Sequence, residues 1–245
     1  MKKIQQGFFI TGTDTGVGKT EVSLGLLLLL KKHGFSTVAL KPIATGCIET
    51  PEGLRNNDAQ LLQKNITKQL SYSDINPISF FEPIAPHIAA KLVNQPLSVK
   101  EIIAACNNTL SVSADFIIIE GTGGWLVPLN AEETMADVAI QFNYPLIIVV
   151  GIRLGCLNHA LLTVSHIKTT SIPIAGWVAN VITPEMPSLF ENIQALTERI
   201  PAPLLGIIPY QKKVEPYSIS HYLESELLSL LKTHHCHAVE PEYPL

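Results

Sequence analysis

Six short apolar runs recur along the chain, and each ends in a polar or glycine-containing turn. The run at residues 116–119 is apolar at every position, without the polar alternation of a half-exposed strand. Such continuous runs are typical of strands buried on both faces of a parallel sheet. The pattern predicts six buried strands, at residues 8–10, 36–40, 116–119, 146–150, 174–179 and 204–208.

Helical stretches separate these runs. Residues 21–30 are rich in leucine and lead into Lys31, Lys32 and Gly34, which are typical of a helix C-terminus. Further predicted helices cover residues 59–64 and 98–110, and one runs through His166. Strands that alternate with helices predict an α/β fold with a mostly parallel central sheet and helices on both faces.

Two stretches carry neither pattern. Residues 47–57 are polar and contain Pro51 and Gly53, which predicts a loop, and Asn57-Asp58 are expected to cap the following helix. Residues 77–96 contain four prolines and are expected to form an irregular surface insertion.

Bulk properties narrow the class of protein. The chain has 245 residues, of which 47% are hydrophobic and 16% charged, so we expect one domain over residues 1–245, with a weakly assigned tail at about 225–245. A net charge of −4 with scattered basic residues argues against a nucleic-acid partner. The longest apolar stretch, residues 24–30, is too short to cross a membrane, and the apolar run that follows the basic N-terminus is too short to form a signal peptide. We expect a cytoplasmic protein.

Cysteine and histidine residues suggest no metal or disulfide framework. The four cysteines lie far apart in sequence, so we expect them to be reduced: Cys47, Cys106, Cys156 and Cys236. A cluster near the C-terminus could capture a metal, although a polar tail is the simpler interpretation: His234, His235, Cys236 and His237.

A glycine-rich loop between the first strand and the first helix carries the main chemical signal. It reads Gly12-Thr13-Asp14-Thr15-Gly16-Val17-Gly18-Lys19-Thr20. Backbone N–H groups in such a loop surround phosphate oxygens, and the helix dipole points the same way. Lys19 would reach the β- and γ-phosphates, and the Thr20 hydroxyl would bind Mg²⁺. The motif is a variant, because Thr13 stands where the usual pattern has its first glycine; the alternative is an ordinary strand–helix turn.

Other polar residues follow the predicted strands. Lys41 and Glu120 come directly after the second and third strands, Asn180 follows the fifth, and Pro209-Tyr210 follow the last. The carboxyl ends of parallel strands meet at one edge of a sheet, so we expect these residues beside the glycine loop, in a P-loop NTPase-like fold. Lys41 could instead be an ordinary surface lysine, and Asp58 either a helix cap alone or also a metal-directed carboxylate.

Seven motifs in order resemble the dethiobiotin synthetase family of the P-loop NTPase superfamily. Besides the glycine loop they start at Lys41-Pro42, Gly53-Leu54, Glu120-Gly121, Gly155-Cys156, Gly176-Trp177 and Pro201-Ala202, and the match extends to about Tyr210. The resemblance implies a homodimeric, ATP- and Mg²⁺-dependent ligase. Such an enzyme joins CO₂ to 7,8-diaminopelargonic acid and closes a cyclic urea through a carbamic–phosphoric anhydride.

The resemblance also implies a role for individual residues. Lys19 and Lys41 would be catalytic and flank the transferred phosphoryl group, whereas Thr20, Asp58 and Glu120 would surround Mg²⁺. Thr45, Gly155, Cys156 and Asn158 would bind the substrate, the last three near the dimer interface. Asn180 would contact the adenine. The full set implied for nucleotide binding is Thr15, Gly16, Val17, Gly18, Lys19, Thr20, Glu21, Asp58, Glu120, Gly121, Thr122, Gly123, Asn180, Val181, Pro209, Tyr210 and Gln211.

Two other functions were weighed. A regulatory P-loop ATPase of the partitioning type usually carries a second lysine five positions before Lys19, where this chain has Asp14. A nucleotide-binding module without catalysis would leave Lys41, Asp58 and Glu120 without roles.

Overall fold

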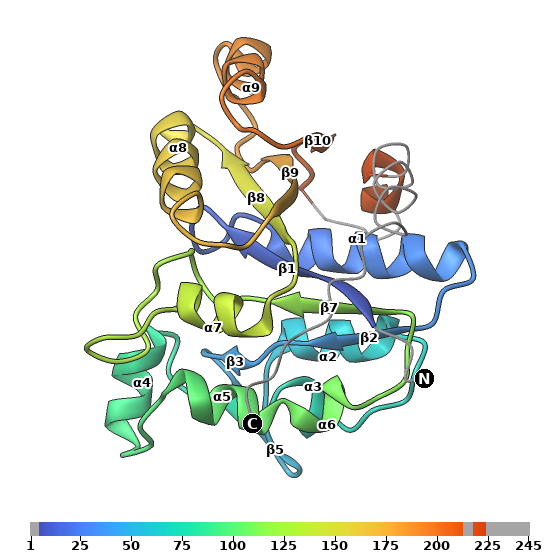
Figure 1. The fold of residues 1–245 in the computed structure, drawn as a ribbon, viewed down its shortest axis with the longest axis vertical. Coiled ribbons are helices and arrows are strands. Elements are labelled where there is room, and N and C mark those ends of the chain that lie inside the picture. The colour runs from blue at the N-terminus through green and yellow to red at the C-terminus, as the bar shows by residue number, and fades with distance from the viewer. Residues whose placement is uncertain (1–4, 213–217, 224–245) are drawn as a thin grey trace.

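The computed structural model describes residues 5–212 and 218–223. Its centre is a sheet of six strands in the order β10-β9-β8-β1-β7-β2, with every neighbouring pair parallel (Figure 1). All six predicted strands are therefore confirmed. Their bounds are β1 Gln6–Gly12, β2 Thr37–Leu40, β7 Phe116–Glu120, β8 Leu146–Ile152, β9 Ile174–Val181 and β10 Leu204–Ile208.

Helices cover both faces of the sheet, as predicted. The side chains of β1 alternate between two cores: Phe8 and Ile10 face one, and Phe9 faces the other. The first core also contains residues of α1 (Lys19–Lys32), α2 (Asn57–Asn65) and α3 (Tyr72–Ile75). The second receives residues of α4 (Pro86–Leu92), α5 (Val99–Ala105), α7 (Met135–Phe142), α8 (Cys156–Ile167) and α9 (Leu189–Thr197).

Three local predictions were wrong. Residues 47–57 contain an antiparallel hairpin of β4 (Ile48–Thr50) and β5 (Gly53–Arg55), and the cap of α2 is Asn56, whose Oδ1 accepts the N–H of Ala59. The proline-rich insertion contains β6 (Ile78–Ser79), paired with β3 (Ile43–Ala44), and α4. Pro86 begins α4, because proline fits the first turn of a helix.

The helix predicted at residues 98–110 is two helices. The first, α5, ends at Cys106, and α6 (Asn107–Leu110) follows directly. A hydrogen bond still crosses the junction, since the N–H of Leu110 in α6 donates to the carbonyl of Cys106.

Three of the four cysteines lie within the described residues. Cys47, Cys106 and Cys156 are buried free thiols, and burial raises the pKa of Cys106 to about 12. Cys236 and the histidines beside it lie outside the described residues, as do residues 225–245. Within the described ranges, no helix combines the length and apolar character needed to cross a membrane.

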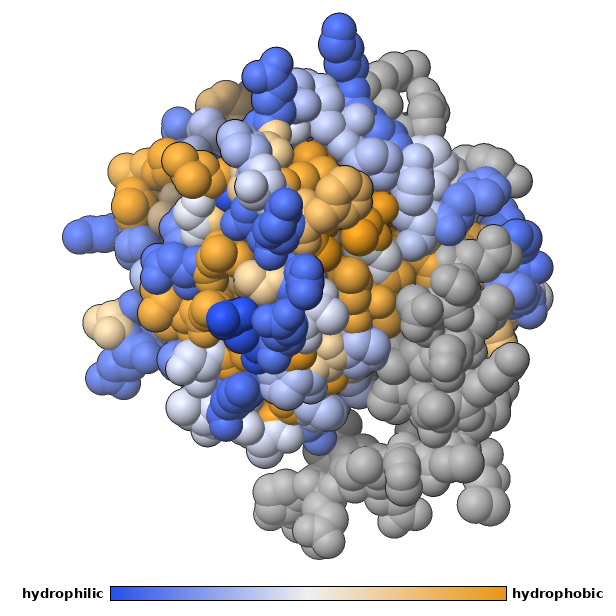
Figure 2. All heavy atoms as spheres, turned by 90° about the horizontal axis from the view of Figure 1, so that it is seen from above, coloured by the Kyte–Doolittle hydropathy of each residue, from blue (hydrophilic) through white to orange (hydrophobic). Residues whose placement is uncertain are grey.

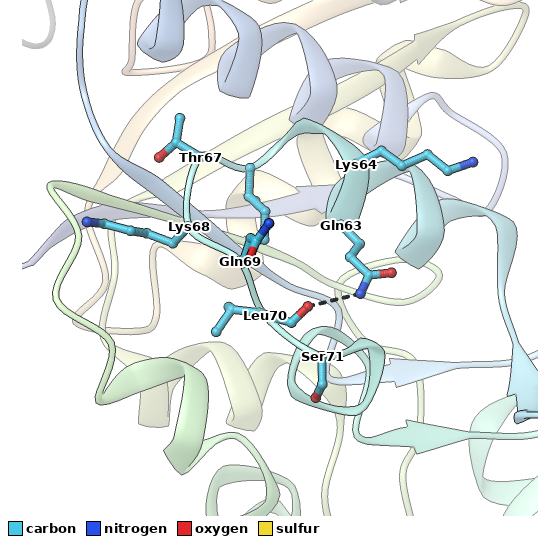
Figure 3. Close-up of a pocket in the computed structure, with 8 residues that line it drawn as sticks. Gln63, Lys64, Thr67, Lys68, Gln69, Leu70 and Ser71 are labelled. Atoms are coloured by element: carbon cyan, nitrogen blue, oxygen red, sulfur yellow. Dashed lines mark hydrogen bonds between the residues drawn. The ribbon is translucent and has the colours of Figure 1, made fainter.

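Two surface hollows are formed by residues outside the predicted site. One, of about 710 Å³, is formed by the turn after α2, where the Gln63 amide donates to the Leu70 carbonyl at 3.0 Å (Figure 3). The other, of about 790 Å³, lies between the C-terminal part of α4 and residues 128–131. None of the predicted site residues lines either of them.

Candidate active site

The glycine loop connects β1 to α1 at the carboxyl edge of the sheet. Gly16 and Gly18 have φ of +71° and +92°, a left-handed backbone that glycine adopts without steric cost. The Lys19 side chain folds back over the loop, and its ammonium group donates to the carbonyl of Asp14 at 3.0 Å. Burial lowers the pKa of Lys19 to about 8, although Glu120, Asp58 and Asp14 act in the opposite direction. Bound phosphates would supply the negative charge that this ammonium group needs.

Lys41, Asp58 and Glu120 meet beside this loop although they come from three separate elements. The ammonium group of Lys41 lies 2.5 Å from Glu120 Oε1 and 3.0 Å from Asp58 Oδ2. The Thr20 hydroxyl donates to the same Glu120 oxygen at 2.8 Å. Lys41 and Glu120 are only 5% and 0% exposed, so Lys41 is not a surface lysine and Glu120 is not a solvated strand end.

The charges in this cluster stabilise one another. Burial by itself would lower the pKa of Lys41, but the two carboxylates outweigh it and raise the pKa above its usual value. The two carboxylates therefore favour the charged form of Lys41. Burial, followed by the charges of Asp58 and Glu120, raises the pKa of nearby Glu21.

The donor set fits Mg²⁺. Thr20, Asp58 and Glu120 supply hard oxygen atoms, which this ion prefers. Glu120 Oε2 is buried and has no hydrogen-bond partner among the described residues, which leaves one carboxylate oxygen free for a ligand. Among the described residues, no three His, Cys, Asp or Glu side chains are grouped so that they could hold a metal ion. The predicted set contains two carboxylates and a hydroxyl, so water and phosphate oxygens would complete the coordination.

Asn180, the residue predicted to contact the adenine, is hydrogen-bonded to the glycine loop. Asn180 lies on β9, and its side-chain amide donates to the carbonyl of Val17 at 2.9 Å. A Cβ atom at Gly18 would collide with this amide, so Gly18 is needed for close approach as well as for its positive φ. Val181 ends β9, and Pro209, Tyr210 and Gln211 follow β10, which adjoins β9.

The loop after β7 connects β1 to β3, which precedes the predicted substrate residue Thr45. The N–H of Gly121 donates to Ile10 of β1, and the Thr122 hydroxyl donates to the carbonyl of Ile43 on β3. Gly123 has φ of +67°. Thr45 follows β3 directly, so Thr122 and Thr45 come from segments that are bonded to each other.

The remaining predicted substrate residues lie at the start of α8. Gly155 precedes the helix with φ of +91°, and the Cys156 side chain is buried whereas Asn158 is exposed. An ion pair of 2.5 Å joins Arg153, just before this helix, to Asp14 in the glycine loop. Sequence reasoning missed this pair, because no local pattern relates residues 139 positions apart.

Known proteins were compared with the chain and its fold. A protein-family profile described as an AAA domain matches residues 6–218. Among solved structures, the septum site-determining protein MinD of Pyrococcus horikoshii has a TM-score of 0.55 at 16% identity, covering 95% of this chain and 98% of its own. A ParA family ATPase of Chlorobium tepidum has a TM-score of 0.52 at 14% identity, with the same coverage. At identities this low, the two structures show that the chain shares the α/β P-loop fold, and they do not show a role in partitioning.

Sequence relatives are much closer. The chain is 47% identical to the ATP-dependent dethiobiotin synthetase BioD of Cellvibrio japonicus, covering 90% of this chain and 96% of the relative. It is 43% identical to the protein of that name from Pseudomonas aeruginosa strain PAO1, over 91% and 98%. With BioD 1 of Escherichia coli K12 the identity is 46% over 83% and 90%. The hypothesis of a partitioning-type ATPase is therefore wrong, and the chain belongs to the dethiobiotin synthetase family.

Proposed function

We propose that this chain is an ATP- and Mg²⁺-dependent ligase that joins CO₂ to 7,8-diaminopelargonic acid and closes the cyclic urea of dethiobiotin. The observation that carries the proposal is the position of Lys41. Its ammonium group lies outside the phosphate loop but contacts Glu120 and Asp58, and Glu120 also binds Thr20 of the loop. Nucleotide binding alone does not require a second buried cation there, whereas phosphoryl transfer to an anionic acceptor does.

The reaction balances without a covalent enzyme intermediate. One substrate amine adds to CO₂, and the resulting carbamate oxygen attacks the γ-phosphorus, so that ADP leaves. The second amine then attacks the carbamate carbon, and phosphate leaves as the ring closes. Lys19 and Lys41 would flank the transferred group and stabilise its negative charge, which preorganised charges do effectively in a buried site. Bound Mg²⁺ would supply further charge neutralisation, held by Thr20, Asp58 and Glu120.

The other residues would bind and orient. Asn180 Nδ2 is held by the loop, which leaves its carbonyl oxygen for the adenine amino group, with Val181 and residues 209–211 beside the ring. Thr45 would donate its hydroxyl to the carbamate. Gly155, Cys156 and Asn158 would place the start of α8 against the substrate carboxylate, since a helix N-terminus favours an anion; the N–H of Cys156 itself donates to the carbonyl of Arg153 at 3.0 Å.

We further infer a cytoplasmic homodimer. Large apolar side chains are exposed around α8 and α9, with Leu154 92%, Leu162 63% and Phe190 75% exposed. Figure 2 views the molecule from the side of these helices, and hydrophobic residues gather on that face. Contiguous exposed apolar surface favours protein contacts. Sedimentation equilibrium of the purified protein would give twice the monomer mass; a monomer at micromolar concentration would contradict the inference.

Labelled bicarbonate tests the function directly. With 7,8-diaminopelargonic acid, ATP and Mg²⁺, label should enter an acid-stable product that has the mass of dethiobiotin, with one ADP formed per ring. Lys41→Gln is the matched control, because it removes the charge and keeps a side chain of similar length. ATP hydrolysis without incorporation of label would contradict the proposal.

A further inference from the structure

A buried network behind the active site connects Lys41 to the helix that carries Asp58. Its centre is Asn76, which is 3% exposed and follows α3. The amide of Asn76 donates to the carbonyl of Lys41 at 2.7 Å and to that of Ile78 at 3.1 Å. Its oxygen accepts the Tyr72 hydroxyl at 2.9 Å and the Ser79 hydroxyl at 2.6 Å. All four hydrogen bonds that an asparagine side chain offers are therefore made.

Tyr72 carries the connection onward to α2. Its oxygen accepts the backbone N–H of Asn56 at 2.7 Å, and the guanidinium of Arg55 lies 4.3 Å from the centre of its ring. Asn56 caps α2 through the N–H of Ala59 and donates from its amide to the carbonyl of Thr45 at 3.3 Å. Asp58 lies in the first turn of the helix that starts after this cap.

The network therefore holds the backbone at three predicted site residues: Lys41, Thr45 and Asp58. Two of them, Lys41 and Asp58, also meet through their side chains at 3.0 Å. Buried hydrogen bonds that are fully satisfied fix one geometry, because any displacement leaves a polar group without a partner. Residues that orient metal ligands in this way typically change metal affinity or activity 10- to 100-fold when they are altered.

We propose that Tyr72 and Asn76 are positioning residues that set the separation of Lys41 from Asp58, and hence the strength of Mg²⁺ binding in the presence of nucleotide. This inference rests on the roles proposed above for Lys41 and Asp58. Neither Tyr72 nor Asn76 touches the candidate Mg²⁺ oxygens directly, so their effect passes through the backbone of Lys41 and through the N-terminus of α2.

The decisive variant is Tyr72→Phe, which removes one hydroxyl and keeps the ring under Arg55. Thr109→Val is the matched control. The buried Thr109 hydroxyl donates to the carbonyl of Asp74 in the same helix α3 at 2.6 Å, but it has no bond to Lys41 or Asn56. Both variants lose one hydroxyl whose hydrogen bonds hold α3 in place, so a purely structural effect should appear in both.

The measurement is titration calorimetry of ADP binding at a series of Mg²⁺ concentrations, together with kcat and KM for ATP and the melting temperature. Tyr72→Phe should raise the Mg²⁺ concentration needed for half-maximal ADP binding about tenfold and lower kcat about tenfold. ADP binding without Mg²⁺ should stay within about twofold. Thr109→Val should leave Mg²⁺ dependence and kcat unchanged. Asn76→Asp, which replaces both amide donors, should reproduce the Tyr72→Phe pattern if it folds.

Two outcomes would overturn the proposal: equal changes in Tyr72→Phe and Thr109→Val, or a wild-type Mg²⁺ dependence in Tyr72→Phe. Failure of the proposed function is a separate result. Wild-type ring closure in Lys41→Gln would remove Lys41 from the reaction, whereas an inactive Lys41→Gln beside a normal Tyr72→Phe would reject only the positioning network.

Discussion

The glycine loop and the charged cluster beside it are built in different ways. The loop draws its shape from nine consecutive residues, with left-handed glycines and a lysine that bonds five positions back. The cluster joins Lys41 to Asp58 and Glu120. Asp58 lies 17 positions from Lys41 in the sequence, and Glu120 lies 79 positions from it. The loop is thus a local structure, whereas the cluster exists only when β2, β7 and α2 are packed together. Substitutions in the glycine loop and in the charged cluster should therefore change different measured properties.

The largest effect is expected in the loop. Lys19→Ala removes the cation aimed at the phosphates, and turnover should fall about 10³-fold, the upper range for loss of one preorganised donor. The fold should survive, because the ammonium group of Lys19 donates to a loop carbonyl, that of Asp14, and not to a group in either apolar core. Dethiobiotin formation and thermal melting measure the two effects. A folded variant with the wild-type rate would show that the loop does not bind the reacting phosphate.

The charged cluster should respond next, and with a different signature. Lys41→Gln removes a cation outside the loop, so ring closure should fall about a hundredfold while ATP affinity falls less than tenfold. Calorimetry with ATP and labelled product under saturating ATP give the two values. Equal losses in binding and rate would mean that Lys41 belongs functionally to the nucleotide loop, and the distinction between the two parts would disappear.

Glu120→Gln tests the cluster as a metal site. The Mg²⁺ concentration for half-maximal rate should rise about tenfold. The free energy of unfolding without metal should fall by about 3 kcal/mol, since the buried Lys41 loses a charged partner. Mg²⁺ titration of the rate and urea denaturation measure these changes. Lower stability at an unaltered Mg²⁺ requirement would identify Glu120 as a structural residue only.

The smallest effect is expected at the contact between the loop and α8. Arg153→Gln breaks an ion pair whose side chains are 40% and 44% exposed, and such pairs contribute less than about 1 kcal/mol. The KM for ATP should change less than about threefold, and urea denaturation should detect little loss. A tenfold change in KM would show that the loop depends on Arg153 as well as on its hydrogen bond with Asn180.

The same contrast explains what could be predicted from the sequence. The six strands were predicted because continuous burial leaves a continuous apolar run, as at residues 116–119 of β7. Lys41, Glu120 and Asn180 were assigned to one edge because parallel strands end there together. The loop residues were recognised because their geometry depends on their own glycines.

The errors share a physical cause. The β4–β5 hairpin is largely exposed, so it has no apolar signature, and α4 follows prolines that suggest irregular backbone. Helices α3, α7 and α9 were not predicted; they have only four, eight and nine residues. Asn76 looks like an ordinary turn residue in the sequence, because three of its partners are near neighbours and only the carbonyl of Lys41, 35 positions away, depends on the tertiary fold.

The position of Lys41 between two carboxylates has a consequence for the protein before it meets any ligand. Asp58 and Glu120 both contact Lys41, and the repulsion between two neighbouring carboxylates is offset where a cation lies between them. Lys41 supplies that cation from within the chain, so the enzyme carries its own counter-ion. Folding should therefore proceed equally well in chelator-treated buffer, and the protein can be purified and stored without magnesium.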